Sequence, residues 1–247
     1  MSKVLRQIGI GCAAVVMAAS FTPTAHAGQP VSAVVELFTS QGCSSCPPAD
    51  SLMGRYAARG DVIALTFAVD YWDYLGWKDT LASPRYAERQ RAYAKGRGDS
   101  SVYTPQAVIN GRLHAVGSSG PDIDKAIQRL SLAQPMTVPI EVREDGLSLV
   151  IEAGEGAATP PGEPATIWLA VMQAEHKVEI ARGENAGRSI TYYNVVRELA
   201  PVGEWRGQAT RITLARDSVM WPGAKACAIL LQQGLGGPIL GAARWQE

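Results

Sequence analysis

The sequence predicts an α/β protein in which a mixed α/β domain is followed by a mainly antiparallel β-sandwich-like domain. From residue 33 to residue 132, short apolar runs rich in β-branched residues alternate with longer segments of helical periodicity. From about residue 136 onward, short runs of alternating polarity stand between Gly, Pro and Asp turns, which is typical of antiparallel sheets. With 247 residues, the chain is long enough for one large domain or two small ones.

The first 27 residues have the pattern of a secretory signal peptide. Lys3 and Arg6 give a positive start, Ile8–Ala19 is apolar, and Ala25-His26-Ala27 fits the small-residue pattern of a cleavage site. The apolar core is too short to span a bilayer, which takes about 20 apolar residues. We therefore expect residues 1–27 to be removed and the mature protein to be soluble, in the periplasm or secreted.

The charge of the chain argues against nucleic acid and membranes as partners. The 23 Lys and Arg residues balance the 23 Asp and Glu residues, and the signal segment carries two of the positive charges and none of the negative ones. The mature chain is therefore close to neutral, whereas binding to phosphate backbones or anionic lipids requires an excess of positive charge. We expect no nucleic acid and, after signal cleavage, no membrane as a partner.

Residues 28–133 are expected to form the first domain, with the element order β-α-β-α-β-β-α. Ser83-Pro84 supplies an N-cap followed by proline at the first helical position. Asn110-Gly111 is the strongest hairpin-turn signal in the chain. The expected elements are strand Ala33–Phe38, helix Ala49–Ala58, strand Val62–Val69, helix Pro84–Lys95, strands Gln106–Ile109 and Arg112–Val116, and helix Pro121–Leu132.

Residues 134–247 are expected to form the second domain, an antiparallel sandwich or barrel. Its segment Gly154–Pro164 is rich in Gly, Pro and Ala, which indicates a loop, and Asn194–Leu199 is expected to be a short helical or irregular insert. The expected strands are Val138–Arg143, Leu147–Ala153, Ala165–Gln173, His176–Ala181, Gln208–Leu214 and Ala226–Gln232.

Two cysteines stand where a strand is followed by a helix, in the sequence Cys43-Ser44-Ser45-Cys46. Two such thiols can close a small disulfide, and a helix N-terminus stabilises a thiolate through its dipole and free N–H groups. So short a loop adds little to global stability, so a reactive pair is favoured over a structural one. Proline disfavours helical dihedrals in the residue before it, so the helix is expected to start at Pro47 or Pro48, one turn after Cys43, which weakens the helix effect. The remaining mature cysteine, Cys227, lies in an apolar run and is expected to be a buried free thiol.

This element order, with a cysteine pair at the first strand–helix junction and Thr104-Pro105 before the hairpin, resembles the thioredoxin fold. The resemblance implies that Cys43 is the nucleophile, that Cys46 is the resolving thiol, and that Pro105 is a cis-proline lying against the disulfide. An ordinary proline at the entry of a strand is the alternative for Pro105. On this interpretation, the candidate catalytic residues are Cys43, Cys46 and Pro105.

The segment Asp70–Asp79, which follows the second strand, contains four aromatic residues within seven positions. The carboxyl ends of neighbouring parallel strands meet at one edge of a sheet, so this segment should approach the cysteine pair. The aromatic side chains then form a docking surface for a peptide, or alternatively they pack against the second domain. The candidate substrate-binding residues are Tyr71, Trp72, Asp73, Trp77 and Thr104.

Longer motifs carry a narrower resemblance. Residues 40–50, 70–79 and 103–106, together with 183–187 and 194–199 in the second domain, resemble an uncharacterised family of secreted bacterial thioredoxin-like proteins. The resemblance implies the fold, export and a cysteine-pair site, but no substrate. The expected function is that of a thiol–disulfide oxidoreductase, whose partner is a thiol- or disulfide-containing protein or a small thiol. The redox potential of the pair decides whether it oxidises or reduces.

A periplasmic module that binds a metal such as copper, or another ligand, is the alternative function. Two thiolates suit Cu(I) or zinc, but a structural zinc site takes four ligands, and the mature chain offers only His114, His176 and Cys227 as further strong ligands. His114 is expected to be a half-exposed strand residue. No cofactor is predicted, because no phosphate-binding or paired-histidine motif is present. The arginines of the polar helix are expected to form a solvated face: Arg85, Arg89 and Arg91.

Overall fold

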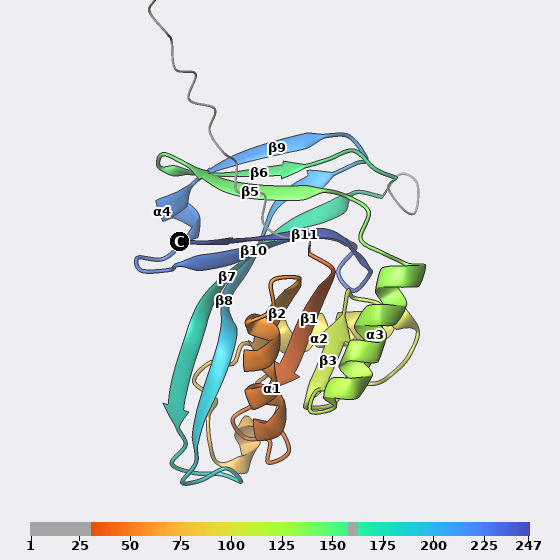
Figure 1. The fold of residues 1–247 in the computed structure, drawn as a ribbon. Helices are drawn as coiled ribbons and strands as arrows, with labels where there is room; N and C mark the ends of the chain where they lie inside the picture. Colours follow the sequence, from red (N-terminus) through yellow and green to blue (C-terminus); the bar gives the residue numbers. More distant parts are fainter. Residues whose placement is uncertain (1–30, 158–162) are drawn as a thin grey trace, which may run out of the picture.

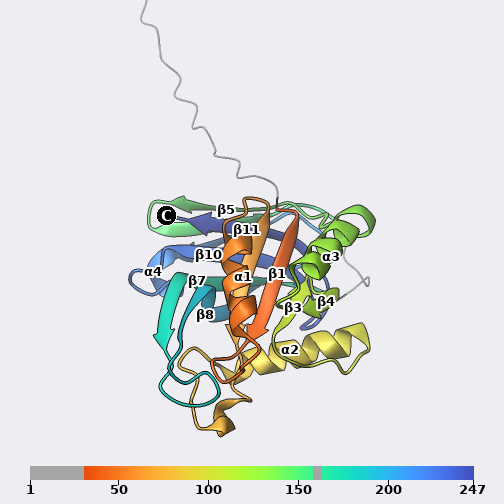
Figure 2. The same ribbon diagram turned by 60° about the horizontal axis from the view of Figure 1, so that its bottom comes forward.

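The computed structural model describes residues 31–157 and 163–247. The predicted signal peptide, residues 1–27, lies outside the described residues. The described chain forms two β-sheets and four α-helices (Figures 1 and 2). In this part of the chain, no helix is both long and apolar enough to cross a membrane.

The N-terminal half, residues 31–133, has the predicted order of strands and helices. Its elements are β1 (Ala33–Thr39), α1 (Pro47–Ala57), β2 (Val62–Ala68), α2 (Pro84–Arg97), β3 (Gln106–Ile109), β4 (Leu113–Val116) and α3 (Gly120–Ala133). A 3-10 turn, η1 (Asp73–Leu75), lies in the aromatic segment. Asn110 and Gly111 form the turn between β3 and β4 with positive φ angles of 49° and 67°, as a tight hairpin requires.

Strands make up most of the C-terminal half, residues 134–247. Its elements are β5 (Ile140–Asp145), β6 (Ser148–Ala153), β7 (Ala165–Glu179), β8 (Ser189–Trp205), β9 (Thr210–Ala215), the short helix α4 (Arg216–Val219), β10 (Ala226–Gln233) and β11 (Ile239–Gln246). Two predicted strands, 165–173 and 176–181, fall largely within the single strand β7, and β11 was not predicted. The insert predicted at 194–199 is wrong, because these residues lie within β8. The β7–β8 pairing shifts register opposite them, between Val171 and Met172, so burial does not alternate and the strand pattern is hidden.

One eight-stranded sheet runs through both halves in the order β11-β10-β7-β8-β2-β1-β3-β4. Strands β1 and β2 are parallel, and β8 continues the sheet beside β2 through the parallel pair Thr66 and Val195. The Thr66 hydroxyl also donates to the Tyr193 carbonyl (2.6 Å). The second sheet, in the order β5-β6-β9, covers the C-terminal strands (Figure 1). The two halves are thus joined by continuous hydrogen-bonded sheet.

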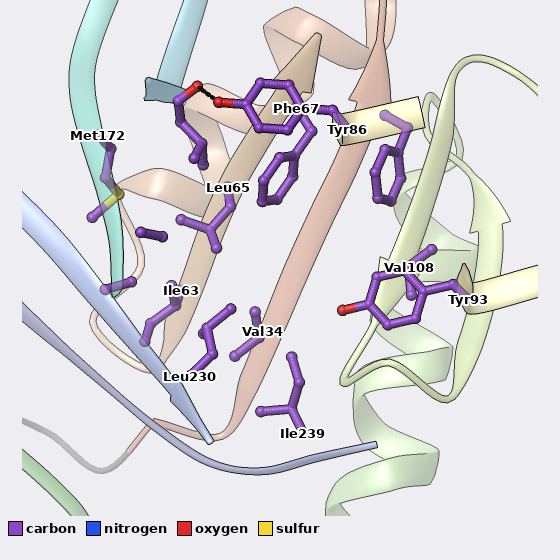
Figure 3. Packing of buried hydrophobic residues seen from close by; sticks show 14 of the residues in the cluster. Val34, Ile63, Leu65, Phe67, Tyr86, Tyr93, Val108, Met172, Leu230 and Ile239 are labelled. Atoms are coloured by element: carbon purple, nitrogen blue, oxygen red, sulfur yellow. Dashed lines mark hydrogen bonds between the residues drawn. The ribbon is translucent and has the colours of Figure 1, made fainter. Parts of the chain in front are cut away.

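Strand β1 is buried on both faces, which explains its unbroken apolar run. Val35 and Leu37 pack against α1 and α3, whereas Val34 and Phe38 belong to the cluster that includes α2. Figure 3 shows this second cluster, to which both halves contribute: Ile63, Leu65, Phe67 and Tyr86 from the N-terminal half, and Met172, Leu230 and Ile239 from the C-terminal half. The core therefore extends from α2 into the C-terminal strands.

A buried ion pair lies between α2 and the large sheet. Arg89, which is 6% exposed, donates to the Glu36 carboxylate of β1 (2.8 Å) and to the Gln232 side chain of β10 (3.0 Å). Of the three arginines predicted to be solvated, Arg85 and Arg91 are exposed. The prediction for Arg89 is wrong, because a carboxylate buried within β1 requires a charged partner.

Candidate functional site

A disulfide between Cys43 and Cys46 closes the loop between β1 and α1. Two successive backbone turns shape this loop, because the N–H of Cys43 bonds the Ser40 carbonyl and the N–H of Cys46 bonds the Cys43 carbonyl, both at 3.1 Å. Cys43 is 2% exposed and Cys46 is 0% exposed, whereas Ser44 and Ser45 between them are exposed. Both cysteines are thus buried, and Cys43 is the slightly more exposed of the two.

Helix α1 begins at Pro47, with Cys46 as its N-cap. Pro47 and Pro48 have no N–H group, and the N–H groups of Ala49 and Asp50 both bond the Cys46 carbonyl (2.8 and 3.1 Å). The start of α1 at Pro47 agrees with the prediction and places Cys43 ahead of the helix. In addition, the first turn of α1 has no free N–H group for a thiolate. The dipole of α1 remains as its electrostatic contribution to the site.

Trp72 lies between the cysteine loop and the loop that contains Pro105. The Thr104–Pro105 peptide bond is cis, which is the geometry that the resemblance implies. The Trp72 indole N–H donates to Thr104 Oγ1 (2.8 Å), and a Cβ atom added to Gly42 would lie 3.0 Å from the Trp72 Cβ. Trp72 therefore contacts both the residue before Cys43 and the residue before Pro105, and the structure brings these predicted site residues together.

The other aromatic residues of segment 70–79 lie in two environments. Tyr74 is 77% exposed and stacks on Trp72, with 6.4 Å between ring centroids and 18° between planes, and Tyr71 is partly buried next to them. Trp77 instead packs against the loop between β7 and β8, where a Cβ atom on Gly183 would lie 3.2 Å from the Trp77 Cβ. For Trp77, the alternative of packing against the second half is therefore the one observed. The docking-surface alternative stays a prediction for the exposed rings.

Two buried polar residues that no chemical motif singles out hold the backbone of the cysteine loop. Asp79 accepts a hydrogen bond from the Gln41 N–H (2.7 Å), and burial raises the pKa of Asp79 to about 6. Asp73, a predicted substrate-binding residue, accepts a hydrogen bond from the Asp79 N–H (3.1 Å). Asn185, between β7 and β8, donates from Nδ2 to the carbonyls of Gln41 (2.9 Å) and Cys43 (2.8 Å). Side chains from both halves therefore fix the loop.

Asp50 is a fully buried carboxyl group one helical turn after Cys46, on the same face of α1. Its Oδ1 accepts a hydrogen bond from the Thr39 hydroxyl (2.7 Å), and its Oδ2 has no partner among the described residues. Burial raises the pKa of Asp50 to about 8, the Thr39 hydrogen bond opposes this shift, and the Asp79 carboxylate adds to it. At neutral pH this carboxyl is therefore mostly protonated.

The remaining candidate metal ligands, His114, His176 and Cys227, each lie within a strand. His114 is partly exposed on β4, as predicted, and its Nδ1 lies 2.9 Å from the Tyr103 hydroxyl, while burial lowers the pKa of this histidine. His176 is partly exposed on β7. Cys227 is confirmed as a buried free thiol, and burial raises its pKa to about 12. Within residues 31–157 and 163–247, no group of three or more His, Cys, Asp or Glu side chains could hold a metal ion.

A family model described as "Protein of unknown function (DUF1223)" matches residues 34–232, a range that includes the cysteine loop, the aromatic segment and the hairpin loop of Asn185. The chain belongs to the DUF1223 family. A crystal structure of a protein from Agrobacterium tumefaciens is 35% identical, with a TM-score of 0.76 over 88% of this chain and 95% of that one. No curated protein matches the chain. The predicted membership of an uncharacterised family is therefore confirmed, and the DUF1223 description brings no substrate with it.

Proposed function

We propose that this DUF1223 protein is an exported, thioredoxin-like thiol–disulfide oxidoreductase that acts through Cys43 and Cys46. The observation that carries the proposal is a disulfide at the end of β1, beside Trp72 and the Thr104–Pro105 loop, in a half whose elements run β-α-β-α-β-β-α. Cys43 is 2% exposed and is followed by the exposed Ser44, whereas Cys46 is 0% exposed, which suits an attacking and a resolving thiol respectively. The signal-like residues 1–27 support export to the periplasm or beyond, where a disulfide persists.

In the oxidising direction, a partner thiolate attacks Cys43 Sγ, the bond between Cys43 and Cys46 breaks, and Cys46 leaves as a thiolate that takes up a proton. A second partner thiol then loses its proton and attacks the partner's own sulfur in the mixed disulfide, and Cys43 leaves as a thiolate. The partner has gained a disulfide, and the cysteine pair has received two electrons. The reducing direction is the reverse, so the relative redox potentials decide which one operates.

Asp50 is the proton donor and acceptor for Cys46 in this proposal. A thiolate at the fully buried Cys46 lies away from water, and an isolated charge in such surroundings is costly. The Asp50 carboxyl follows within one helical turn, is mostly protonated at neutral pH, and has one oxygen held by Thr39 and the other without a partner. Its proton neutralises the leaving thiolate, and the reverse transfer activates Cys46 to attack a mixed disulfide.

The aromatic surface favours a polypeptide as the partner. Trp72 and Tyr74 stack beside the cysteine loop, and Tyr74 is largely exposed, so an apolar side chain near a partner cysteine can bury area against both rings. Tyr71 and Thr104 border this surface and remain candidate substrate-binding residues. The predicted residues Asp73 and Trp77 bond or pack within the protein, so in this proposal they hold the surface in position. Metal binding gains no comparable support, because the described residues place no group of further ligands beside the two cysteines.

The experiment that tests the proposal compares wild type, Cys43→Ser and Cys227→Ala in two assays, reduction of insulin by a dithiol and oxidation of a peptide dithiol. Wild type is expected to accelerate at least one reaction, and Cys43→Ser is expected to fall to the uncatalysed rate, because no mixed disulfide forms at position 43. Cys227→Ala is the matched control, since it removes a cysteine that belongs to a core cluster of the C-terminal half and not to the cysteine loop. Inactive wild type, or Cys43→Ser with the wild-type rate, would show the proposal to be wrong.

A further inference from the structure

We infer that Asn185, in the C-terminal half, is a positioning residue of the cysteine site and that its side-chain amide stabilises the disulfide form of the Cys43–Cys46 pair. This inference rests on the proposed function, because it assigns a residue to the same redox site. The hydrogen bonds of Asn185 go to backbone carbonyls, so its effect passes through the backbone of the cysteine loop.

The hairpin formed by β7 and β8 brings Asn185 to the site. In Figures 1 and 2, the loop between these strands, residues 180–188, lies beside the loop that precedes α1. The loop is held by its own backbone: Gly187 N–H bonds the Ile180 carbonyl (2.8 Å) and Arg188 N–H bonds the Asn185 carbonyl (3.1 Å). Gly183 and Gly187 have φ angles of 80° and 78°, which favour glycine at both positions. Asn185 is therefore presented from a well-defined turn.

The hydrogen bonds of Asn185 fix the orientation of its amide. Both Nδ2 hydrogens have acceptors, the carbonyls of Gln41 and Cys43, at 2.9 and 2.8 Å. The Oδ1 atom is buried without a partner among the described residues, which ordinarily costs free energy. The reversed orientation is excluded, because it would direct Oδ1 at two carbonyl oxygens. Both donors of the amide therefore act on the cysteine loop, while its acceptor does not.

Asn185 and Asp79 bind different backbone groups of the cysteine loop. Asp79 accepts from the N–H of Gln41, while Asn185 binds the carbonyls of Gln41 and Cys43. Held from both halves, Cys43 has little freedom to move away from Cys46 once the disulfide is reduced. Restricted separation raises the effective concentration of one thiol toward the other, and this favours the disulfide form. Loss of the Asn185 amide should therefore shift the equilibrium toward the dithiol.

The test measures the equilibrium of the pair with reduced and oxidised glutathione in wild type, Asn185→Ala and Asn194→Ala. Asn194 is the matched control, because its Nδ2 also donates to a backbone carbonyl, that of Ala64 (3.0 Å). This hydrogen bond joins β8 to β2 and does not involve the cysteine loop. In Asn185→Ala, the equilibrium constant for reduction of the disulfide by glutathione is expected to rise by about tenfold. This change corresponds to the loss of one to two hydrogen bonds. Asn194→Ala is expected to lose stability in urea without a comparable shift.

The outcomes separate this inference from the proposed function. Wild type that exchanges with glutathione, together with an Asn185→Ala constant equal to that of wild type, overturns the positioning role and leaves the proposed function standing. Wild type that does not exchange at all overturns the proposed function itself. If Asn185→Ala does not fold, Asn185→Ser, which keeps one donor, is expected to show a smaller shift in the same direction, and no shift in that variant overturns the inference.

Discussion

At the scale of one residue, Asp50 bears on both the stability of the protein and its proposed chemistry. It follows Ala49 and precedes Leu52 and Met53, all of which are buried on the inner face of α1, so the carboxyl is shielded from solvent. The Thr39 hydroxyl satisfies one oxygen and no described group satisfies the other. The fold therefore holds this group in its neutral form, which is the form that can give a proton to Cys46.

The pH dependence of stability should report Asp50 directly. Its pKa is about 8 in the folded protein and near 3.8 in the unfolded chain, so between these values the folded state retains a proton that the unfolded state has lost. The free energy of unfolding should therefore fall as pH rises through this range, by up to about 1.4 kcal/mol per pH unit from this group. We predict that Asp50→Asn removes this slope, measured by urea denaturation of the oxidised protein between pH 6.5 and 8.

Above pH 6.5, the slope reports mainly Asp50 and not Asp79. Burial raises the pKa of Asp79 to about 6, so its own contribution of the same sign is largely complete at lower pH. The matched control is Asp145→Asn, which neutralises a carboxylate on the exposed end of β5 and should keep the wild-type slope. Parallel slopes for wild type and Asp50→Asn would mean that Asp50 does not hold a proton in the folded protein.

The sequence reveals some site residues and hides others for a physical reason. Cys43, Cys46 and Pro105 stand out because their spacing and residue types are unusual, and Trp72 stands out because it belongs to an aromatic-rich segment. Asp50 and Asn185 are ordinary polar residues whose importance comes from burial. The sequence signals for them are a lone acid within the apolar face of α1 and their places in the family motifs, residues 40–50 for Asp50 and residues 183–187 for Asn185.

At the scale of elements, a buried charge on helix α2 joins two strands that are far apart in the sequence. Arg89 lies between Glu36 on β1 and Gln232 on β10, and the Tyr93 hydroxyl also donates to Glu36. The Arg89 guanidinium lies over the Phe67 ring as well, 5.6 Å from its centroid. The helix was predicted correctly from its cap and proline, but its inner face was not, because Glu36 and Gln232 lie far away in the sequence.

Removing one partner of this ion pair should be strongly destabilising. Arg89→Met leaves the Glu36 carboxylate buried without its cation, and we expect the free energy of unfolding to fall by about 3–5 kcal/mol. Arg85→Met, an exposed position on the same helix, should change it by less than about 0.5 kcal/mol. Urea denaturation of both variants checks the prediction, and an Arg89→Met stability similar to that of Arg85→Met would contradict it.

At the scale of the whole molecule, the site depends on both halves of the chain. Local patterns predict the strands and helices of the first half, since each is contained in a short stretch of sequence. The joining of β8 to β2 involves Thr66 and Val195, which no local pattern relates, so the continuous sheet could not be predicted. This same joining brings the loop of Asn185 to the cysteine loop, and the proposed exchange therefore belongs to the full DUF1223 chain.

The central claim is that partners react at Cys43, while Cys46 remains buried and does not react with them. The most direct measurement is intact-mass and peptide-mapping analysis of reduced Cys46→Ala and Cys43→Ala after mixing with insulin as the disulfide partner. The account predicts that Cys46→Ala accumulates an adduct in which insulin is linked by a disulfide at Cys43, and that Cys43→Ala accumulates far less at Cys46, because that sulfur is fully buried. Equal trapping at both cysteines, or trapping at Cys46 alone, would contradict it.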